Sequence, residues 1–149
     1  NLNLSQEVEL HAFALMPNHF HLLLKQYTPE GIPTLMKRLN TAYVMYFNHK
    51  YKRVGRLFQN IYKCCLVDSD EQITHLSRYI HRNPISVKDQ VNFMNFSSYS
   101  YYLNQKKASW IHTSFILSYF SEKFPYKKFV EDYDNSSKKF ISNLIIEEY

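Results

Sequence analysis

The fold is decided by one stretch, Met16-Pro17-Asn18-His19-Phe20-His21, which is followed by Leu22-Leu23-Leu24. Two histidines flank one bulky apolar residue at the start of an apolar run. In an extended strand side chains alternate between faces, so His19 and His21 would share a face, with Cα atoms about 7 Å apart. Imidazoles at that spacing can converge on one metal ion. Taken alone, however, the pair is better interpreted as an ordinary polar face.

The flanking residues predict a β-hairpin followed by a helix. Residues 7–16 alternate between apolar side chains and polar ones such as His11, which is typical of a strand with one buried face. Pro17-Asn18 is a turn signal, and residues 19–26 form the next strand. From residue 32 to about residue 51 apolar side chains recur at intervals of three and four, which predicts an amphipathic helix.

A third strand and a second helix are expected next. Residues 57–67 are rich in aromatic and β-branched side chains and predict a strand. The short polar side chains of Asp68-Ser69-Asp70 can satisfy free amides at a helix start, so a helix is predicted over residues 71–82. Asn83-Pro84 ends this helix, because the residue before a proline disfavours the helical region.

The second helix carries two neighbouring stripes of side chains. One stripe is apolar and should pack on the sheet; it consists of Ile73, Leu76 and Ile80. The adjacent stripe is polar and has a spacing of four; it consists of His75, Tyr79 and Asn83. Each polar residue also has an ordinary interpretation, as a surface histidine, a tyrosine at the edge of a core and a helix C-terminal residue.

The pattern weakens after Pro84. Residues 93–103 predict a loop and a short helix, and helices are expected over residues 114–120, 126–132 and 138–147. We therefore divide the chain into a domain over residues 1–103 and a helical C-terminal tail over residues 104–149.

The composition is that of an ordinary globular protein. The chain has 149 residues, 45% of them hydrophobic and 21% charged, which is enough for one domain with a real core. No apolar run is long enough to span a membrane, and no signal peptide is visible. Adjacent Cys64 and Cys65 cannot easily pair with each other, which favours a reducing, cytoplasmic location. Gly31 and Gly55 are the only glycines, so nucleotide-driven chemistry with a glycine-rich loop is not expected.

Positive charge is concentrated in one part of the sequence. The chain has a formal net charge of +5, yet residues 31–67 contain no Asp or Glu and seven basic residues. The chain also has 13 tyrosines, and a basic segment with aromatic residues is typical of a nucleic-acid surface. A solvated helix face and loop is the plainer alternative. The candidate DNA-binding residues are Lys37, Arg38, Lys50, Lys52, Arg53, Arg56 and Lys63.

Three motifs carry a family resemblance. They are Leu15-Met16-Pro17-Asn18-His19-Phe20-His21-Leu22-Leu23, Gly55-Arg56-Leu57-Phe58-Gln59 and Tyr79-Ile80-His81-Arg82-Asn83-Pro84. In this order they resemble the REP-associated tyrosine transposases, which belong to the single-tyrosine branch of the HUH nucleases. Ser97-Ser98-Tyr99 and Tyr126-Lys127-Lys128-Phe129-Val130 are similar to later segments of the same family.

The resemblance implies a fold, an activity and a set of site residues. The fold is an α/β (α+β) ferredoxin-like sandwich, whose antiparallel sheet carries the histidine strand with helices packed on it. The activity is cleavage and rejoining of single-stranded or hairpin DNA, by a monomer or a homodimer. By position, His19 and His21 are metal ligands, Tyr79 is the nucleophile and Asn83 is a third ligand.

The chain departs from the family in two places. Family members usually have another strand and helix before the first strand seen here, so the sheet is expected either to be incomplete or to be completed by something else. The position of Arg56 is often histidine in the family, so the local DNA contacts are expected to differ more than the chemistry.

The same residue types suit metal-assisted phosphodiester chemistry. A divalent cation polarises a phosphate, and two imidazoles with an amide and waters suit Mg or Mn, although imidazole also binds Zn, Ni or Co. Tyr79 would attack the phosphorus and leave a 5′-phosphotyrosine. Because a phenol has a pKa of about 10, it needs the metal or a nearby base, and His75 is a possible helper.

Two other interpretations stay open. A domesticated or truncated protein could bind DNA hairpins without cutting them. Alternatively, His19, His21 and a cysteine could form a structural zinc site, although only one of two adjacent cysteines could face it.

Overall fold

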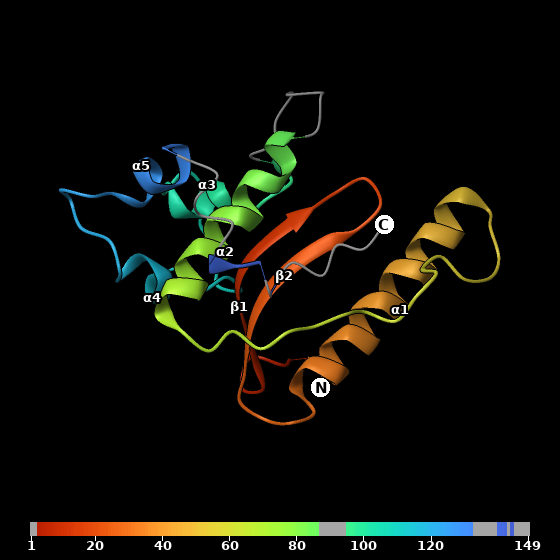
Figure 1. Ribbon diagram of the computed structural model, residues 1–149. Helices are drawn as coiled ribbons and strands as arrows, with labels where there is room; N and C mark the ends of the chain where they lie inside the picture. The colour runs from red at the N-terminus through yellow and green to blue at the C-terminus, as the bar shows by residue number, and fades with distance from the viewer. Residues whose placement is uncertain (1–2, 87–94, 133–139, 143, 145–149) are drawn as a thin grey trace. The chain divides into compact units, whose positions relative to one another are not determined.

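The computed structural model describes residues 3–86, 95–132, 140–142 and 144, and within these ranges the fold is α+β (Figure 1). Strands β1 (Val8–Leu15) and β2 (Phe20–Gln26) form an antiparallel hairpin. The remaining elements are the long helix α1 (Gly31–Tyr51), helix α2 (Asp70–Arg82), the 3₁₀ turn η1 (Asn83–Ser86), and the short helices α3 (Tyr99–Tyr102), α4 (Ser114–Leu117) and α5 (Tyr126–Glu131). The predicted hairpin and the two long helices are confirmed.

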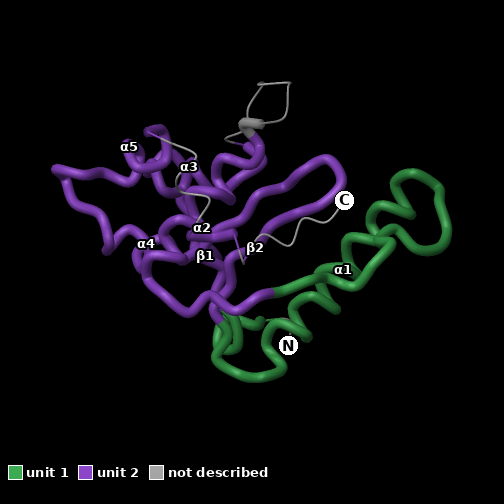
Figure 2. The backbone as a smooth tube through the Cα atoms, in the orientation of Figure 1, with its two compact units in different colours: residues 1–8, 26–64 green, residues 9–25, 65–149 purple. Residues whose placement is uncertain are grey.

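The chain forms two compact units (Figure 2). Unit 1 comprises residues 1–8 and 26–64 and contains α1. Unit 2 comprises residues 9–25 and 65–149 and contains most of the hairpin, α2 and the short helices. The boundary predicted at residue 103 falls inside unit 2.

The core of unit 2 lies between one face of the hairpin and α2. Ala12, Ala14 and Leu23 are buried on the strands, and Ile80 of α2 packs into the same cluster. The cluster is completed from later segments of the chain by Tyr99, Tyr102, Ile116, Tyr126 and Val130. The segment beyond residue 103 therefore contributes side chains to the core that α2 covers.

Helix α2 begins where the polar cluster predicts. The Ser69 hydroxyl accepts a hydrogen bond from the backbone N–H of Gln72 at 3.2 Å, which satisfies one free amide of the first turn. Ile73 and Leu76 are half-buried against the core, as predicted. Beyond Arg82 the chain tightens into η1, where the ring of Pro84 supplies no N–H to continue the helix.

The strand predicted over residues 57–67 is wrong. No described residue in that stretch joins a strand ladder. β1 instead makes single bridges to later segments, antiparallel at Ser97 and parallel at Ile111. A composition rich in aromatic and β-branched residues indicates that a segment can pack on a half-buried, pleated surface. It does not indicate whether another strand is present to pair with that segment.

The predicted polar face of β1 is partly covered. His11 is 2% exposed, its Nδ1 donates to the His112 carbonyl oxygen at 2.8 Å, and its ring lies 5.5 Å from that of Phe115. Burial lowers the pKa of His11, although Glu9 at 3.6 Å acts in the opposite direction. The alternation on β1 therefore predicts the strand correctly but not the exposure of this residue.

The remaining expectations have mixed outcomes. The short helix expected within residues 93–103 is α3, and α4 and α5 fall within two other predicted helices. Most of the helix expected over residues 138–147 lies outside the described residues. Neither Cys64 nor Cys65 forms a disulfide bond with a described residue, and the Cys65 thiol donates to the Leu144 carbonyl oxygen at 3.4 Å. Among the described helices, none has both the length and the apolar character that crossing a membrane requires.

Candidate active site

The hairpin turn brings the two histidines of the opening motif together. The backbone N–H of Met16 donates to the His19 carbonyl oxygen at 2.9 Å, which closes the turn directly before β2. The Nε2 atoms of His19 and His21 lie 3.1 Å apart, and their ring planes are nearly perpendicular at 88°. Both side chains are half-buried, so the pair remains accessible at the end of the hairpin.

This geometry fits a divalent cation held by two imidazoles. Two nitrogens bonded to one cation at about 2.1 Å lie about 3.0 Å apart in octahedral geometry and about 3.4 Å apart in tetrahedral geometry. The Nε2–Nε2 separation of 3.1 Å, which is also a hydrogen-bond distance, lies in this range. In the described part of the chain, no group of three or more His, Cys, Asp or Glu side chains could hold a metal ion. A structural zinc site with a cysteine gains no support from the described residues.

Asn18 orients the first of these histidines. The Asn18 side-chain oxygen lies 2.7 Å from His19 Nδ1 and can accept its proton. With the proton on Nδ1, the lone pair of Nε2 faces His21 and accepts from its Nε2–H at 3.1 Å; the same lone pair could hold a cation if His21 carried its proton on Nδ1. An outer hydrogen bond of this kind commonly sets the tautomer of a metal-binding histidine. Sequence reasoning used Asn18 only as a turn residue and missed this contact.

Helix α2 places Tyr79 beside the histidine pair. The rings of Tyr79 and His21 lie 5.8 Å apart at 76°, and Tyr79 is half-buried at the edge of the core. The orientation follows from the neighbouring position, because Ile80 is 2% exposed and turns its side chain into the core. The structure thus brings Tyr79 to the pair formed by His19 and His21, although the tyrosine is distant from both in the sequence.

The other two residues of the polar stripe have different surroundings. The backbone N–H of Asn83 donates to the Tyr79 carbonyl oxygen, so Asn83 follows Tyr79 by one turn. His75 Nδ1 accepts a hydrogen bond from the Arg78 guanidinium at 2.8 Å, and its ring stacks on Phe140 at 4.4 Å. The roles of Asn83 as a ligand and of His75 as a helper stay predictions.

A buried hydrogen-bond chain anchors α2 next to Tyr79. His81 is fully buried, with Nδ1 at 2.7 Å from the Tyr126 hydroxyl and Nε2 at 2.6 Å from the Ser98 hydroxyl. Because Tyr126 donates to Ser77 at 3.0 Å, it accepts from His81 Nδ1, and Nε2 then accepts from Ser98. The Ser98 oxygen in turn accepts from the backbone N–H of Phe13 at 2.9 Å.

The buried imidazole is neutral. Burial lowers the pKa of His81 to about 3. His81, Ser98 and Tyr126 all lie in motifs with a family resemblance, but sequence reasoning gave them no role. Their presence in those motifs was the signal that the sequence offered. The contacts between them could be found only from the tertiary structure.

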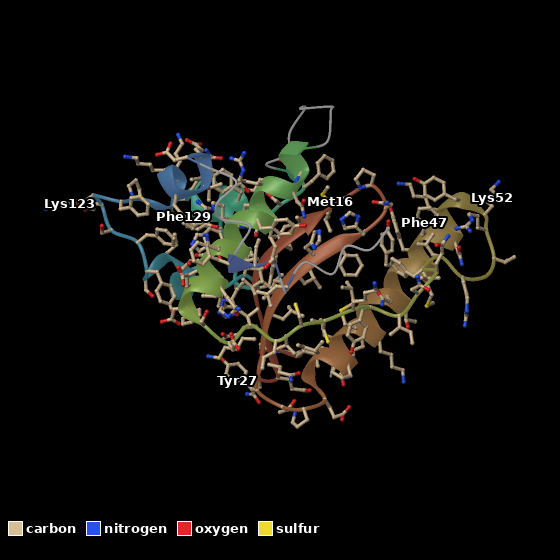
Figure 3. The ribbon with its side chains drawn as sticks, viewed as in Figure 1. Met16, Tyr27, Phe47, Lys52, Lys123 and Phe129 are labelled. Atoms are coloured by element: carbon tan, nitrogen blue, oxygen red, sulfur yellow. The ribbon has the colours of Figure 1, made fainter. Side chains whose placement is uncertain are left out.

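Two arginines of α2 donate hydrogen bonds to helix α5, which carries Phe129, labelled in Figure 3. The guanidinium of Arg78 donates to the Phe129 carbonyl oxygen, and that of Arg82 donates to the Val130 carbonyl oxygen, each at 3.0 Å. The Arg78 guanidinium also lies 4.0 Å from the centre of the Phe129 ring. Cations stabilise free carbonyls at the end of a helix, so these contacts hold α5 against the helix that carries Tyr79.

The predicted DNA-binding residues all belong to unit 1, and all are exposed. Lys37 and Arg38 line a shallow hollow along α1, and Arg56 lines a second one with Phe58. Lys52 caps α1 in the left-handed conformation (φ 51°). The basic segment is therefore an accessible surface of its own unit.

Comparison with known proteins adds a family to this geometry. The sequence model of a family described as "Transposase IS200 like" matches residues 1–83, which is more than half of the chain. No curated protein and no solved structure matches the chain. The matched residues include the histidine pair, the basic segment and Tyr79. The chain belongs to the IS200-like transposase family, whose members are DNA-binding and DNA-cleaving enzymes.

Proposed function

We propose that this protein is a metal-dependent single-strand DNA endonuclease and strand transferase with Tyr79 as its nucleophile. One observation carries the proposal. The Tyr79 ring lies 5.8 Å from that of His21, whose Nε2 converges with His19 Nε2 at 3.1 Å. A phenol beside a pair of cation-binding imidazoles is the set of groups that covalent phosphodiester cleavage requires.

The proposed reaction exchanges one phosphoester bond for another. The Tyr79 oxygen attacks the phosphorus and loses its proton, while the bond to the 3′ oxygen breaks and that oxygen takes up a proton. The products are a 5′-phosphotyrosine and a free 3′-OH, and attack by a 3′-OH on the phosphotyrosine reverses the exchange. A bound Mg²⁺ or Mn²⁺ would withdraw charge from the phosphate oxygens. His19 and His21 would hold it, with Asn83 as the proposed third ligand.

The proposed substrate is single-stranded DNA or a REP-like hairpin. The resemblance to REP-associated transposases supports this choice, and so does the exposed basic surface of unit 1. Lysine and arginine contacts to phosphates give affinity that depends on salt and carries no sequence information. The same resemblance suggests that the hairpin and its helices are part of a ferredoxin-like sheet fold.

The site is proposed to be assembled within one chain. His21 and Tyr79 of the same chain are already in ring contact, and the core residue Ile80 holds the helix that carries the tyrosine. A homodimer would then contain two complete sites.

Covalent capture tests the function. The protein is incubated with labelled hairpin and single-stranded oligonucleotides and Mn²⁺, and adducts are resolved on a denaturing gel. Tyr79→Phe is expected to abolish the adduct and to bind DNA as before, and Tyr27→Phe serves as the matched control. Undiminished adduct in Tyr79→Phe would rule out this nucleophile. DNA binding by the unaltered protein without any adduct would favour a non-cleaving hairpin-binding protein.

Mixing two inactive variants tests assembly within one chain. A Tyr79→Phe chain keeps the histidine pair, and a His19→Ala/His21→Ala chain keeps the tyrosine. If each site is built within one chain, the mixture stays inactive. Recovery of adduct on mixing would show that two chains share a site.

A further inference from the structure

The C-terminal end of α1 carries a group of aromatic and cationic side chains that the proposed chemistry does not use. The group, here named the aromatic–cation cluster, consists of Tyr46, Phe47, Lys50, Tyr51 and Arg53. Lys50 Nζ lies 5.6 Å from the centre of the Tyr46 ring and 5.5 Å from that of Tyr51. The Arg53 guanidinium lies 5.6 Å from the centre of the Phe47 ring.

The tyrosine rings of the cluster are open to solvent. Tyr46 is 57% exposed and Tyr51 is 55% exposed, whereas only Gly31 and Met36 of α1 are buried. Phe47 supports Tyr51 from behind, with ring centres 4.5 Å apart. Large aromatic surfaces left open on a helix commonly mark a binding site.

Charge decides which class of partner fits this surface. No acidic residue occurs between positions 31 and 67, so the cluster lies in a segment with seven basic residues and no acidic ones. A second copy of the chain would bring an identical cationic face against this one, which like-charge repulsion opposes. A polyanion with flat apolar groups matches both the charge and the exposed rings.

We propose that the aromatic–cation cluster binds an unpaired segment of a DNA strand, with bases stacked on Tyr46 and Tyr51 and phosphates held by Lys50 and Arg53. Bases in a duplex are already stacked on each other, so only unpaired nucleotides can offer a face to these rings. The proposal rests on the proposed function for the identity of the polymer. It goes further by assigning the bases to particular side chains.

Binding to matched oligonucleotides tests the assignment without requiring cleavage. Affinity is measured by fluorescence anisotropy for a single strand, the same strand carrying abasic sites, and the corresponding duplex. Tyr46→Leu/Tyr51→Leu keeps apolar bulk but removes the ring faces, and it is expected to weaken single-strand binding about 5- to 100-fold. Tyr46→Phe/Tyr51→Phe should restore that binding. The affinity for the duplex should change little. Abasic sites should lower the single-strand affinity of the unaltered protein more than that of the leucine variant.

The controls separate this proposal from contact with a second copy of the chain and from the proposed nuclease activity. Tyr27→Leu removes an equally exposed ring outside the cluster and should leave single-strand binding unchanged. Equal single-strand affinity of the leucine variant and the unaltered protein would overturn the assignment, and so would a loss shared equally by duplex and single strand. If the leucine variant differed from the unaltered protein in oligomeric mass, measured by analytical ultracentrifugation, but bound DNA with the same affinity, the surface would be assigned to contact with a second copy instead. Loss of the Tyr79 adduct tests the nuclease separately, because the binding assay does not depend on cleavage.

Discussion

The protonation of a single imidazole decides whether the candidate site can accept a cation. His19 can present the lone pair of Nε2 only when its proton is on Nδ1. The Asn18 oxygen, 2.7 Å from that nitrogen, favours this tautomer. The Nε2 of His21 lies 3.1 Å away and donates to that lone pair, so His21 must carry its proton on Nδ1 instead before both imidazoles can hold one cation.

Replacing Asn18 should weaken metal binding more than it changes the stability of the fold. In Asn18→Ala the ring of His19 loses its acceptor, and we expect the affinity for Mn²⁺ to fall about 10- to 100-fold, as is typical when such an outer contact is lost. Asn18→Asp keeps an oxygen at that position and should retain most of the affinity. The measurement is a Mn²⁺ titration followed by electron paramagnetic resonance, with the thermal midpoint as a check on folding. Equal affinities in the alanine variant and the unaltered protein would contradict a role for Asn18.

At the scale of elements, α2 is held in place by polar contacts as much as by its apolar face. His81 links it through Ser98 to β1 and through Tyr126 to α5. Hydrogen bonds of this kind fix the rotation of a helix more narrowly than apolar packing does, because each has a short distance and a preferred direction. Tyr79 is two residues from this anchor, so its position depends on the same contacts.

The buried imidazole should make stability depend on pH. In the folded protein the pKa of His81 is about 3, whereas an unfolded chain has a histidine pKa of about 6.5. Below pH about 6.5 the unfolded chain binds a proton that the folded chain excludes. The free energy of unfolding should therefore fall as the pH is lowered from about 6.5 towards about 3, by up to about 1.4 kcal/mol per unit.

Denaturant titrations between pH 4.5 and 7.5 measure this slope. His11 has a lowered pKa for the same main reason and adds to the slope in the same direction, so the comparison needs a variant. His81→Gln keeps one donor and one acceptor but cannot titrate, and its slope should be shallower than that of the unaltered protein. Equal slopes would show that His81 does not contribute.

At the scale of the whole molecule, the segment after residue 103 contributes to the core of unit 2. Ile116, Tyr126 and Val130 pack in the same cluster as Ile80, and the carbonyl oxygens of Phe129 and Val130 receive the arginines of α2. The segment thus contributes both apolar surface and polar partners to the helix that carries Tyr79.

Truncation should reveal this dependence. A chain ending at Leu103 would leave Ile80 and Tyr99 partly uncovered and His81 without Tyr126. We expect it to lose the cooperative unfolding transition, as followed by circular dichroism. A chain ending at Asp132 keeps α5 and should retain a transition. A cooperative transition of normal midpoint in the shorter chain would instead support an independent domain over residues 1–103.

Local patterns in the sequence predicted the elements and the residues of the candidate site. Alternation along residues 7–16, the turn at Pro17-Asn18 and the helical spacing over 32–51 depend on neighbours within a few positions, and all three correspond to observed elements. The motifs also singled out His19, His21 and Tyr79 before any contact between them was visible.

Long-range contacts decided the rest. The sequence over residues 57–67 has the composition of a strand, but β1 makes its bridges with Ser97 and Ile111 instead. Sequence reasoning gave His81 no role, yet it is buried, and Ser98 and Tyr126 from distant segments supply its partners. A periodic pattern indicates which face of an element is apolar. Which segment covers that face and satisfies its polar groups is decided only when distant segments pack together.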